Sequence, residues 1–444
     1  MSSQTSAPPT ITLHNALLIL PSSPVPTPGS LTLSATTGLI TSIDLNSLEL
    51  AIDSSTTAIN LHSLILAPGY LDLQVNGLAG VHFTRLCPSG TTDPEDDAKL
   101  LQCARMQASA GVTGWWATIP TVPQPRWKQI LPALAPRSFV AAGGAEMLGA
   151  HCEGPFLCPA KKGAHCADFM LEPAAVPVGE VYGERNLEMV LKMITVAPEL
   201  PGAPDLIRQV KAKWPWVRVA IGHTAASYEE AVEGIRAGAS MVTHTFNAMN
   251  GVTGREPGVP GLMEGAEKGV WYSAIADGVH LHRAVLDMAV QLGLHDDGNG
   301  SGRCIGITDA IELAGLEDGV YGGNGQIVGR QIKEGNKVTI EGTGTLVGSC
   351  VLVDHVVREL AGINAAGAQG GVSEAWKHLG EEERGKRLVK GVKAVSENVA
   401  AMMGEKERGL LAAGKRADLV VLDWEGSVRE TWVAGTRVFQ RIPG

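Results

Sequence analysis

Long apolar runs are missing from this 444-residue chain: no stretch of roughly 18 or more apolar residues occurs, so we expect no membrane span. Residues 1–21 have no basic region and only a short apolar run, which argues against a secretory signal peptide. The seven cysteines form no Cys-x-x-Cys pair, which excludes a disulfide scaffold and a structural zinc finger. We therefore expect a cytoplasmic protein with reduced thiols.

Blocks of basic residues are also missing. The chain has 36 Lys and Arg against 46 Asp and Glu, a formal net charge of −10, so we expect no nucleic-acid partner. A few well-placed cations can still hold a small anionic substrate in an acidic protein. No Gly-x-Gly-x-x-Gly motif follows a predicted strand, which argues against dinucleotide binding.

What is present fits a packed globular protein. Hydrophobic residues make up 44% of the chain and charged residues 18%, and the length predicts one large domain with a small one. Residues 10–66 and 409–440 alternate apolar residues with Gly, Pro and Ser, which predicts short strands. These two β-rich ends could form one small domain.

Between the two ends, strand-like segments alternate with amphipathic helical stretches. The clearest helix covers residues 227–238, where Ser227 and Glu230 have capping-box spacing and Gly238 is a stop signal. Such alternation over about 300 residues predicts a parallel α/β sheet, most simply a (β/α)₈ barrel, with a doubly wound sheet as the alternative. The segments expected to be strands are 115–122, 146–154, 216–224, 240–246, 271–280 and 303–310.

Polar residues stand at the carboxyl ends of several predicted strands, where a barrel carries its catalytic side chains. His223 and His244 are one strand–helix repeat apart, which brings both imidazoles to one rim. Two imidazoles and a carboxylate with an open position form a catalytic divalent-metal set. Each histidine taken alone could instead be a hydrogen-bonded core residue. The strand-end residues are Glu153, His223, His244, His280 and Asp309.

Other polar side chains have two interpretations each. Asp309 could shuttle a proton beside a metal or cap a helix N-terminus. Arg255, in the long loop 246–258, suits either a bidentate phosphate contact or a surface ion pair. Lys161 and Lys162 are most simply solvated loop charges.

Several motifs, taken in chain order, carry a resemblance to a known family. They are LAPGYLDLQVNG (66–77), GAHCEGPFLCPAKKGAH (149–165), IGHTAASYEEA (221–231), THTFNAMNGVTGREPGVPG (243–261), IADGVH (275–280), GITDA (306–310), GTLVGS (344–349) and ERGLLAAGKRADLVVLD (407–423). Together they resemble the N-acetylglucosamine-6-phosphate deacetylase family of the amidohydrolase superfamily over roughly residues 10–440. EGPF with KKGAH and FNAM with REPG are specific to this family.

The resemblance implies a distorted (β/α)₈ barrel over residues 67–399 and a small β-sandwich domain from residues 1–66 and 400–444. It implies a cytoplasmic homodimer in amino-sugar catabolism. The implied reaction is metal-dependent hydrolysis of the N-acetyl group of N-acetylglucosamine 6-phosphate to glucosamine 6-phosphate and acetate.

The resemblance also implies roles for individual residues. Glu153, His223 and His244 match the family's metal ligands, and Asp309 matches its catalytic acid/base. Arg255 would reach the phosphate of the substrate in the neighbouring subunit. The positions that match substrate contacts are Ala164, His165, Asn247, Ala248, Arg255, His280, Leu346, Val347 and Gly348.

The sequence also differs from related sequences at two places, one of which bears on the number of metal ions. Gln74 and Asn76 stand where many amidohydrolases carry the His-x-His of a second metal, so we expect one divalent ion per subunit: Zn²⁺, Fe²⁺ or Co²⁺. GVTG at 251–254 replaces the two histidines that often precede REPG. Residues 361–371, expected to form a surface loop, and 381–387, expected to begin a helix, should lie outside the site.

Two other functions remain open at this point. Another amidohydrolase, such as a D-aminoacylase or dihydroorotase, would usually need His-x-His and a different substrate loop. A non-catalytic amidohydrolase-like scaffold should have lost a ligand or the Asp, whereas this chain keeps Glu153, His223, His244 and Asp309.

Overall fold

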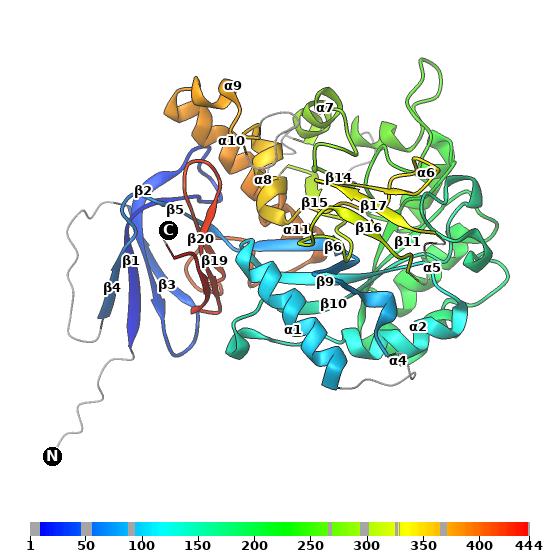
Figure 1. Cartoon of the computed structure of the whole chain (residues 1–444), viewed down its shortest axis with the longest axis horizontal. Helices are drawn as coiled ribbons and strands as arrows, with labels where there is room; N and C mark the ends of the chain where they lie inside the picture. Colours follow the sequence, from blue (N-terminus) through cyan, green and yellow to red (C-terminus); the bar gives the residue numbers. More distant parts are fainter. Residues whose placement is uncertain are drawn as a thin grey trace.

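The computed structural model describes residues 9–45, 56–87, 94–264, 269–293, 302–324, 327, 329–364 and 371–442. Figure 1 shows a β layer at one end of the molecule and a larger barrel of strands and helices beside it. Among the described residues, no helix is long and apolar enough to cross a membrane.

The barrel is an eight-stranded parallel sheet in the order β15-β14-β13-β12-β11-β10-β9-β6. A parallel bridge between Val75, the last residue of β6, and Ala310, three residues beyond β15, closes the barrel. Its strands are almost wholly buried, which is why they read as apolar runs. They are β6 Tyr70–Val75, β9 Val112–Pro120, β10 Glu146–Glu153, β11 Leu191–Val196, β12 Arg218–Ile221, β13 Met241–Val242, β14 Trp271–Ile275 and β15 Cys304–Ile307.

Helices cover the outside of the barrel (Figure 1). The predicted helix 227–238 is α6, and both hydrogen bonds of its capping box, between Ser227 and Glu230, are present. The helices are α1 Pro94–Ser109, α2 Gln124–Ile130, α3 Val178–Tyr182, α4 Glu184–Met189, α5 Ala203–Lys213, α6 Tyr228–Ala237, α7 Arg283–Gly293, α8 Val353–Ala361, α9 Glu374–Lys377, α10 Glu381–Ala394 and α11 Glu397–Met403. Short 3₁₀ helices are η1 Phe83–Arg85, η2 Leu131–Leu134, η3 Val140–Ala142, η4 Pro159–Lys161, η5 Ala167–Phe169 and η6 Val259–Glu264.

A second sheet contains strands from both ends of the chain, in the order β21-β20-β19-β5-β1-β2-β3, with β4 paired to β1. It has its own apolar core, which includes Leu13, Leu31 and Leu419. The predicted barrel with a small β unit from both termini is therefore confirmed. The strands are β1 Thr10–Leu18, β2 Thr27–Ser34, β3 Ile40–Asp44, β4 Thr56–Asn60, β5 Ile65–Pro68, β19 Leu419–Leu422, β20 Val428–Val433 and β21 Thr436–Gln440.

The exact division of the chain at residues 66 and 400 stays a prediction; helix α11 runs across residue 400. The segment 381–387 begins α10, as expected of a helix start. Of the loop predicted at 361–371, residues 365–370 lie outside the described residues.

The described residues also form two small antiparallel sheets. Strands β16 Gly319–Tyr321, β17 Gln331–Glu334 and β18 Lys337–Ile340 follow the last barrel strand, and β7 Gly77–Leu78 pairs with β8 Val81–His82. A bridge from Thr339 to Leu346 connects the three-stranded sheet to residues 346–348. This sheet therefore supports one wall of the site described next.

Candidate active site

A cavity of about 170 Å³ opens at the carboxyl ends of the barrel strands. The structure brings every predicted site residue except Arg255 to its wall. These residues are Glu153, Ala164, His165, His223, His244, Asn247, Ala248, His280, Asp309, Leu346, Val347 and Gly348. Residues from distant parts of the sequence meet here because parallel strands end at the same rim.

Glu153 ends β10, and His223 and His244 follow β12 and β13. Glu153 Oε1 lies 3.3 Å from His223 Nε2 and 2.8 Å from His244 Nε2, and the two Nε2 atoms are 3.2 Å apart. Tetrahedral bonds of roughly 2.0–2.1 Å would put ligand atoms about 3.3 Å apart. The spacing of these three atoms fits a divalent metal.

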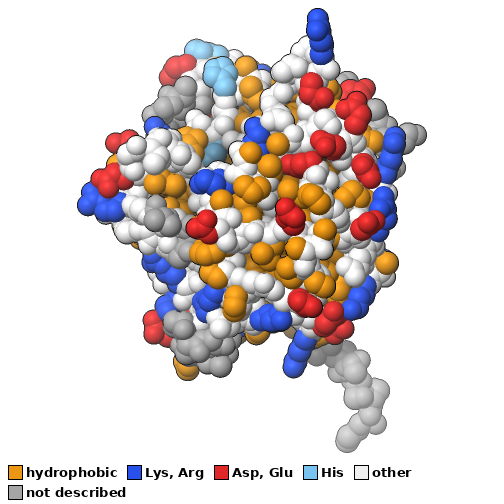
Figure 2. Space-filling model, turned by 90° about the vertical axis from the view of Figure 1, so that its right-hand side faces the viewer, with side chains coloured by type: hydrophobic (Ala, Val, Ile, Leu, Met, Phe, Trp, Pro, Cys, Tyr) orange, Lys and Arg blue, Asp and Glu red, His pale blue; other side chains and the backbone are white. Residues whose placement is uncertain are grey.

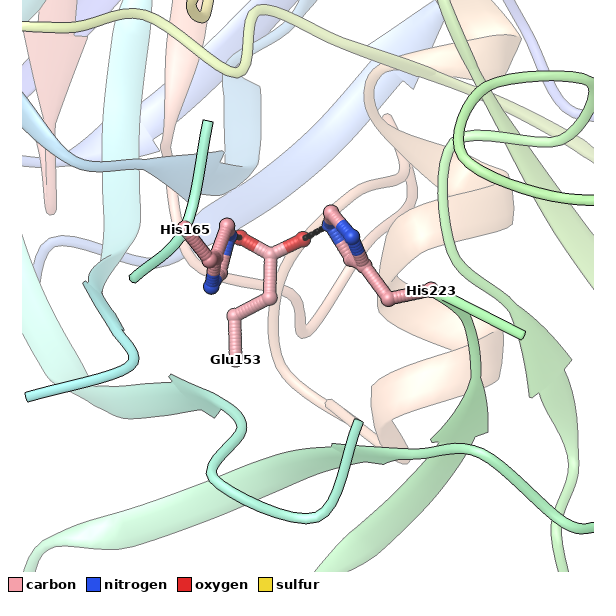
Figure 3. A group of neighbouring side chains, drawn as sticks. All are labelled: Glu153, His165 and His223. Carbon is pink, nitrogen blue, oxygen red and sulfur yellow. Dashed lines mark ion pairs between the residues drawn. The ribbon is translucent and has the colours of Figure 1, made fainter. Parts of the chain in front are cut away.

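His165 lies in the same group, since one ligand atom each of Glu153, His165 and His223 lie within 4.8 Å of one another. Figure 3 shows the Glu153 carboxylate between the two rings, with one oxygen toward each. His165 Nε2 is 3.9 Å from Glu153 Oε2. On geometry alone, therefore, either His244 or His165 could be the third ligand beside Glu153 and His223.

Hydrogen bonds at the far ring nitrogens separate these histidines chemically. His223 Nδ1 lies 2.8 Å from the Lys161 carbonyl oxygen, which can only accept, so the neutral ring has a bare Nε2 suited to a metal. The Thr121 backbone N–H donates to His165 Nδ1 at 3.3 Å. The neutral His165 ring therefore carries its proton on Nε2, where it is a hydrogen-bond donor. Burial, followed by the charge of His223, lowers the pKa of His165 to about 3.

Electrostatics inside the cluster also favour a cation. Burial would raise the pKa of Glu153, but the neighbouring His223 and His244 side chains hold it well below its usual range, so the carboxyl group is ionised. A buried carboxylate facing a bare imidazole lone pair is unfavourable unless a positive charge lies between them. The residues present therefore fit a bound divalent ion.

Asp309 follows β15 at the barrel seam. Burial, with the charge of Glu153 as the next cause, raises its pKa to about 6. Its Oδ1 accepts hydrogen bonds from Gln74 Nε2 at 3.1 Å and Asn76 Nδ2 at 2.8 Å. No helix begins in the described residues between β15 and β16, so a helix-cap role does not account for this side chain.

Three of these residues have left-handed backbone conformations: φ is 47° at His223, 31° at His244 and 48° at Asp309. Residues other than Gly seldom adopt such angles, and they persist where the surrounding structure holds them in place. The conformation turns each side chain as its strand ends. It also explains why β13 covers only Met241–Val242 instead of the predicted 240–246.

His280 uses both ring nitrogens within the protein. Nδ1 lies 2.6 Å from Asp277 Oδ2, and Nε2 lies 3.0 Å from the Val347 carbonyl oxygen. Burial alone would lower the pKa of His280, but the Asp277 hydrogen bond and charge raise it. The sequence interpretation missed both Asp277 and Thr121. Asp277 could have been found by the strand-end rule, because it closely follows β14.

Arg255 lies outside this cavity, with its side chain exposed. The adjacent residue, Glu256, holds the loop in place: its Oε1 accepts hydrogen bonds from the backbone N–H groups of Tyr228 and Gly258. Residues 251–254, which depart from the family motif, are also exposed. Arg255 is therefore the one predicted site residue that the described structure leaves at the surface, away from the cavity.

Comparison with known proteins gives concordant matches. A sequence model described as "Amidohydrolase family" matches residues 353–439. The chain is 31% identical over 390 residues to the N-acetylglucosamine-6-phosphate deacetylase of Caenorhabditis elegans, covering 86% of this chain and 84% of that protein. It is 31% identical to the N-acetylgalactosamine-6-phosphate deacetylase of Escherichia coli O157:H7, covering 84% of this chain and 87% of that protein.

Among solved structures, it resembles a mutant N-acetyl-D-glucosamine-6-phosphate deacetylase of Mycobacterium smegmatis in complex with N-acetyl-D-glucosamine-6-phosphate. The TM-score is 0.76 at 26% identity, over 97% of this chain and 99% of that one. The barrel, the rim cluster and these matches define a metal-dependent amidohydrolase. Within that class, the chain belongs to the N-acetylglucosamine-6-phosphate deacetylase family.

Proposed function

We propose that this protein hydrolyses the N-acetyl group of N-acetylglucosamine 6-phosphate, giving glucosamine 6-phosphate and acetate. The observation that carries the proposal is the meeting of Glu153, His223, His244 and Asp309 in one cavity of a chain with this family membership. A scaffold without activity would have no need to keep all four side chains in reach of one another.

Glu153, His223 and His244 would hold the divalent ion, which supplies Lewis acidity and makes a water molecule a better nucleophile. Asp309, which faces the cavity, accepts a proton from that water as it attacks the acetyl carbon. The same carboxyl group then gives the proton to the nitrogen that leaves. Asp309 is thus general base and then general acid.

His165 has a different task in this scheme. Its Nε2–H is directed into the same cluster, because Thr121 donates to its Nδ1. We assign this donor to the acetyl carbonyl oxygen, where negative charge develops during the attack. A neutral donor suits this position, since the low pKa of His165 keeps it from becoming cationic.

One ion per subunit is part of the proposal, and zinc is the ion we expect. Gln74 and Asn76 stand at the positions where many amidohydrolases carry the two histidines that hold a second metal, and amide groups are poor zinc ligands beside imidazole. Iron and cobalt would also suit a set of two histidines and one glutamate.

The direct test is product analysis with purified protein. N-acetylglucosamine 6-phosphate should give acetate and free amine in equal amounts, and the unphosphorylated sugar should react far more slowly. N-acetylgalactosamine 6-phosphate belongs in the same assay, because one relative is named for it. Faster release from the galactose epimer would move the proposal to that substrate, and no acetate from either phosphate would refute it.

Arg255 is proposed to bind the substrate phosphate of a neighbouring subunit. Arg255→Ala should weaken turnover of the phosphorylated substrate far more than that of the unphosphorylated sugar, because only the phosphate loses a charge-assisted contact. The measurement is kcat/KM for both sugars. An equal fall for both would make Arg255 structural.

The homodimer that this role requires is also proposed. Figure 2 shows hydrophobic side chains gathered near the centre of one face, between dispersed acidic and basic side chains, and a second copy could cover such a patch. Mixing Arg255→Ala subunits with Asp309→Asn subunits should restore part of the activity in mixed dimers. Absence of rescue would place Arg255 in the site of its own chain. A cytoplasmic location stays a prediction.

A further inference from the structure

The side-chain amide of Gln74 lies between two acidic side chains of the site. The sequence pattern accounts for Gln74 only as the replacement of a metal-binding histidine. Gln74 Nε2 lies 3.1 Å from Glu153 Oε1 and 3.1 Å from Asp309 Oδ1. Asn76 Nδ2 lies 2.8 Å from the same Asp309 oxygen. Ionised carboxylates only accept hydrogen bonds, so both amides must turn their N–H groups toward them. Gln74 therefore forms a cross-link between the two carboxylates, and Asn76 adds a second donor at its Asp309 end.

This cross-link treats the two oxygens of Asp309 differently. Oδ1 receives two N–H donors, whereas Oδ2 has no hydrogen-bond partner in the described part of the chain. Donors on an ionised oxygen stabilise its charge and make it a poorer proton acceptor. The oxygen left to take a proton is Oδ2, on a residue that lines the cavity.

The backbone around the cross-link is fixed by the barrel seam. The Asp309 N–H donates to the Gln74 carbonyl at 2.9 Å, and the Asn76 N–H donates to the Ala310 carbonyl at 2.7 Å. Asp72 Oδ2 accepts from Thr308 Oγ1 at 2.9 Å, which adds a side-chain link between the same two strands. Gln74 is fully buried and Asn76 is 5% exposed. Both amides are thus held against Asp309 by the fold itself.

We propose that Gln74 and Asn76 are positioning residues, which hold Asp309 by Oδ1 and present Oδ2 to the reacting water. The inference rests on the proposed function and assigns its proton to one atom. As the water oxygen bonds to the acetyl carbon, its O–H bond breaks and the proton moves to Oδ2. When the C–N bond breaks, Oδ2 returns that proton to the leaving nitrogen, so no other reactant is needed.

The test replaces Asn76 rather than Gln74. Asn76 donates to Asp309, whereas Gln74 also donates to the ligand Glu153, so the loss of Asn76 should spare the metal. Asn76→Asp keeps the size of the side chain but sets an oxygen against Asp309 Oδ1. We expect kcat to fall at least ~10-fold, with KM within about threefold and metal content unchanged, because small misplacements of a catalytic group are costly. Asn76→Ala should also lower kcat, by a smaller factor, while KM and metal content stay nearly unchanged. This variant provides the test if Asn76→Asp does not fold.

Asn398→Asp is the matched control. Asn398 is also a buried amide, 4% exposed, and its Nδ2 donates at 2.7 Å to the Cys304 carbonyl at the opposite end of β15. It should lose thermal stability without the selective fall in kcat. Unchanged kcat in both Asn76 variants, metal loss in parallel with activity, or an equal fall in the control would overturn the proposal. Wild-type protein that releases no acetate would instead refute the proposed function, which keeps the two failures distinct.

Discussion

Replacing Asp309 by Asn should leave a folded, metal-loaded protein whose turnover is at least ~10²-fold lower. Asn has nearly the same size, and its carbonyl oxygen can still accept from Gln74 and Asn76. It cannot accept and return a proton in the way that a carboxylate does. The measurement is kcat for acetate release, beside metal content and thermal unfolding of the same preparation.

Glu312→Gln provides a control on the same segment. Glu312 is a buried carboxylate, 3% exposed, that accepts from Asn324 and Gln331 and does not line the cavity. It should lose stability but keep turnover near that of the wild type. If Asp309→Asn turns over within a few-fold of the wild type, Asp309 is not the proton carrier.

Removing either predicted histidine ligand should abolish metal binding and activity together. His223→Ala or His244→Ala leaves only two protein ligands, and we expect a larger loss of affinity than the ~10–100-fold that outer-shell changes cost. Metal content measured alongside turnover tests this expectation. Full metal retention with normal activity in either variant would refute that residue as a ligand.

His165→Ala is the informative comparison, because His165 lies in the same cluster. Its hydrogen bond from Thr121 makes Nε2 a donor, so this variant should keep its metal while turnover falls. If His165→Ala loses the metal and His244→Ala keeps it, His165 is the metal ligand and His244 is not.

Much of the fold could be predicted from local patterns. Helix α6 was predicted because Ser227, Glu230 and Gly238 supply both helix-end signals. Strand β11, Leu191–Val196, was missed, because a short apolar run does not distinguish a strand from a buried helical segment. Strand β13 was predicted too long, because the left-handed turn at His244 depends on tertiary contacts.

The sequence could predict which residue types meet at the site, since strand-end residues of a barrel converge at one rim. The hydrogen bonds that assign each group its task could not. Lys161 sets the tautomer of His223, Thr121 sets that of His165, and Gln74 bridges two carboxylates. These contacts join residues distant in sequence, and no periodicity or spacing encodes them.

The most direct test of the whole account is acetate release as metal is returned to the stripped protein. Metal-free protein should be inactive toward N-acetylglucosamine 6-phosphate, and addition of Zn²⁺ should restore acetate release in proportion until about one equivalent per chain is bound. Absence of acetate with Zn²⁺, Fe²⁺ or Co²⁺, or activity that appears only as a second equivalent binds, would contradict the account.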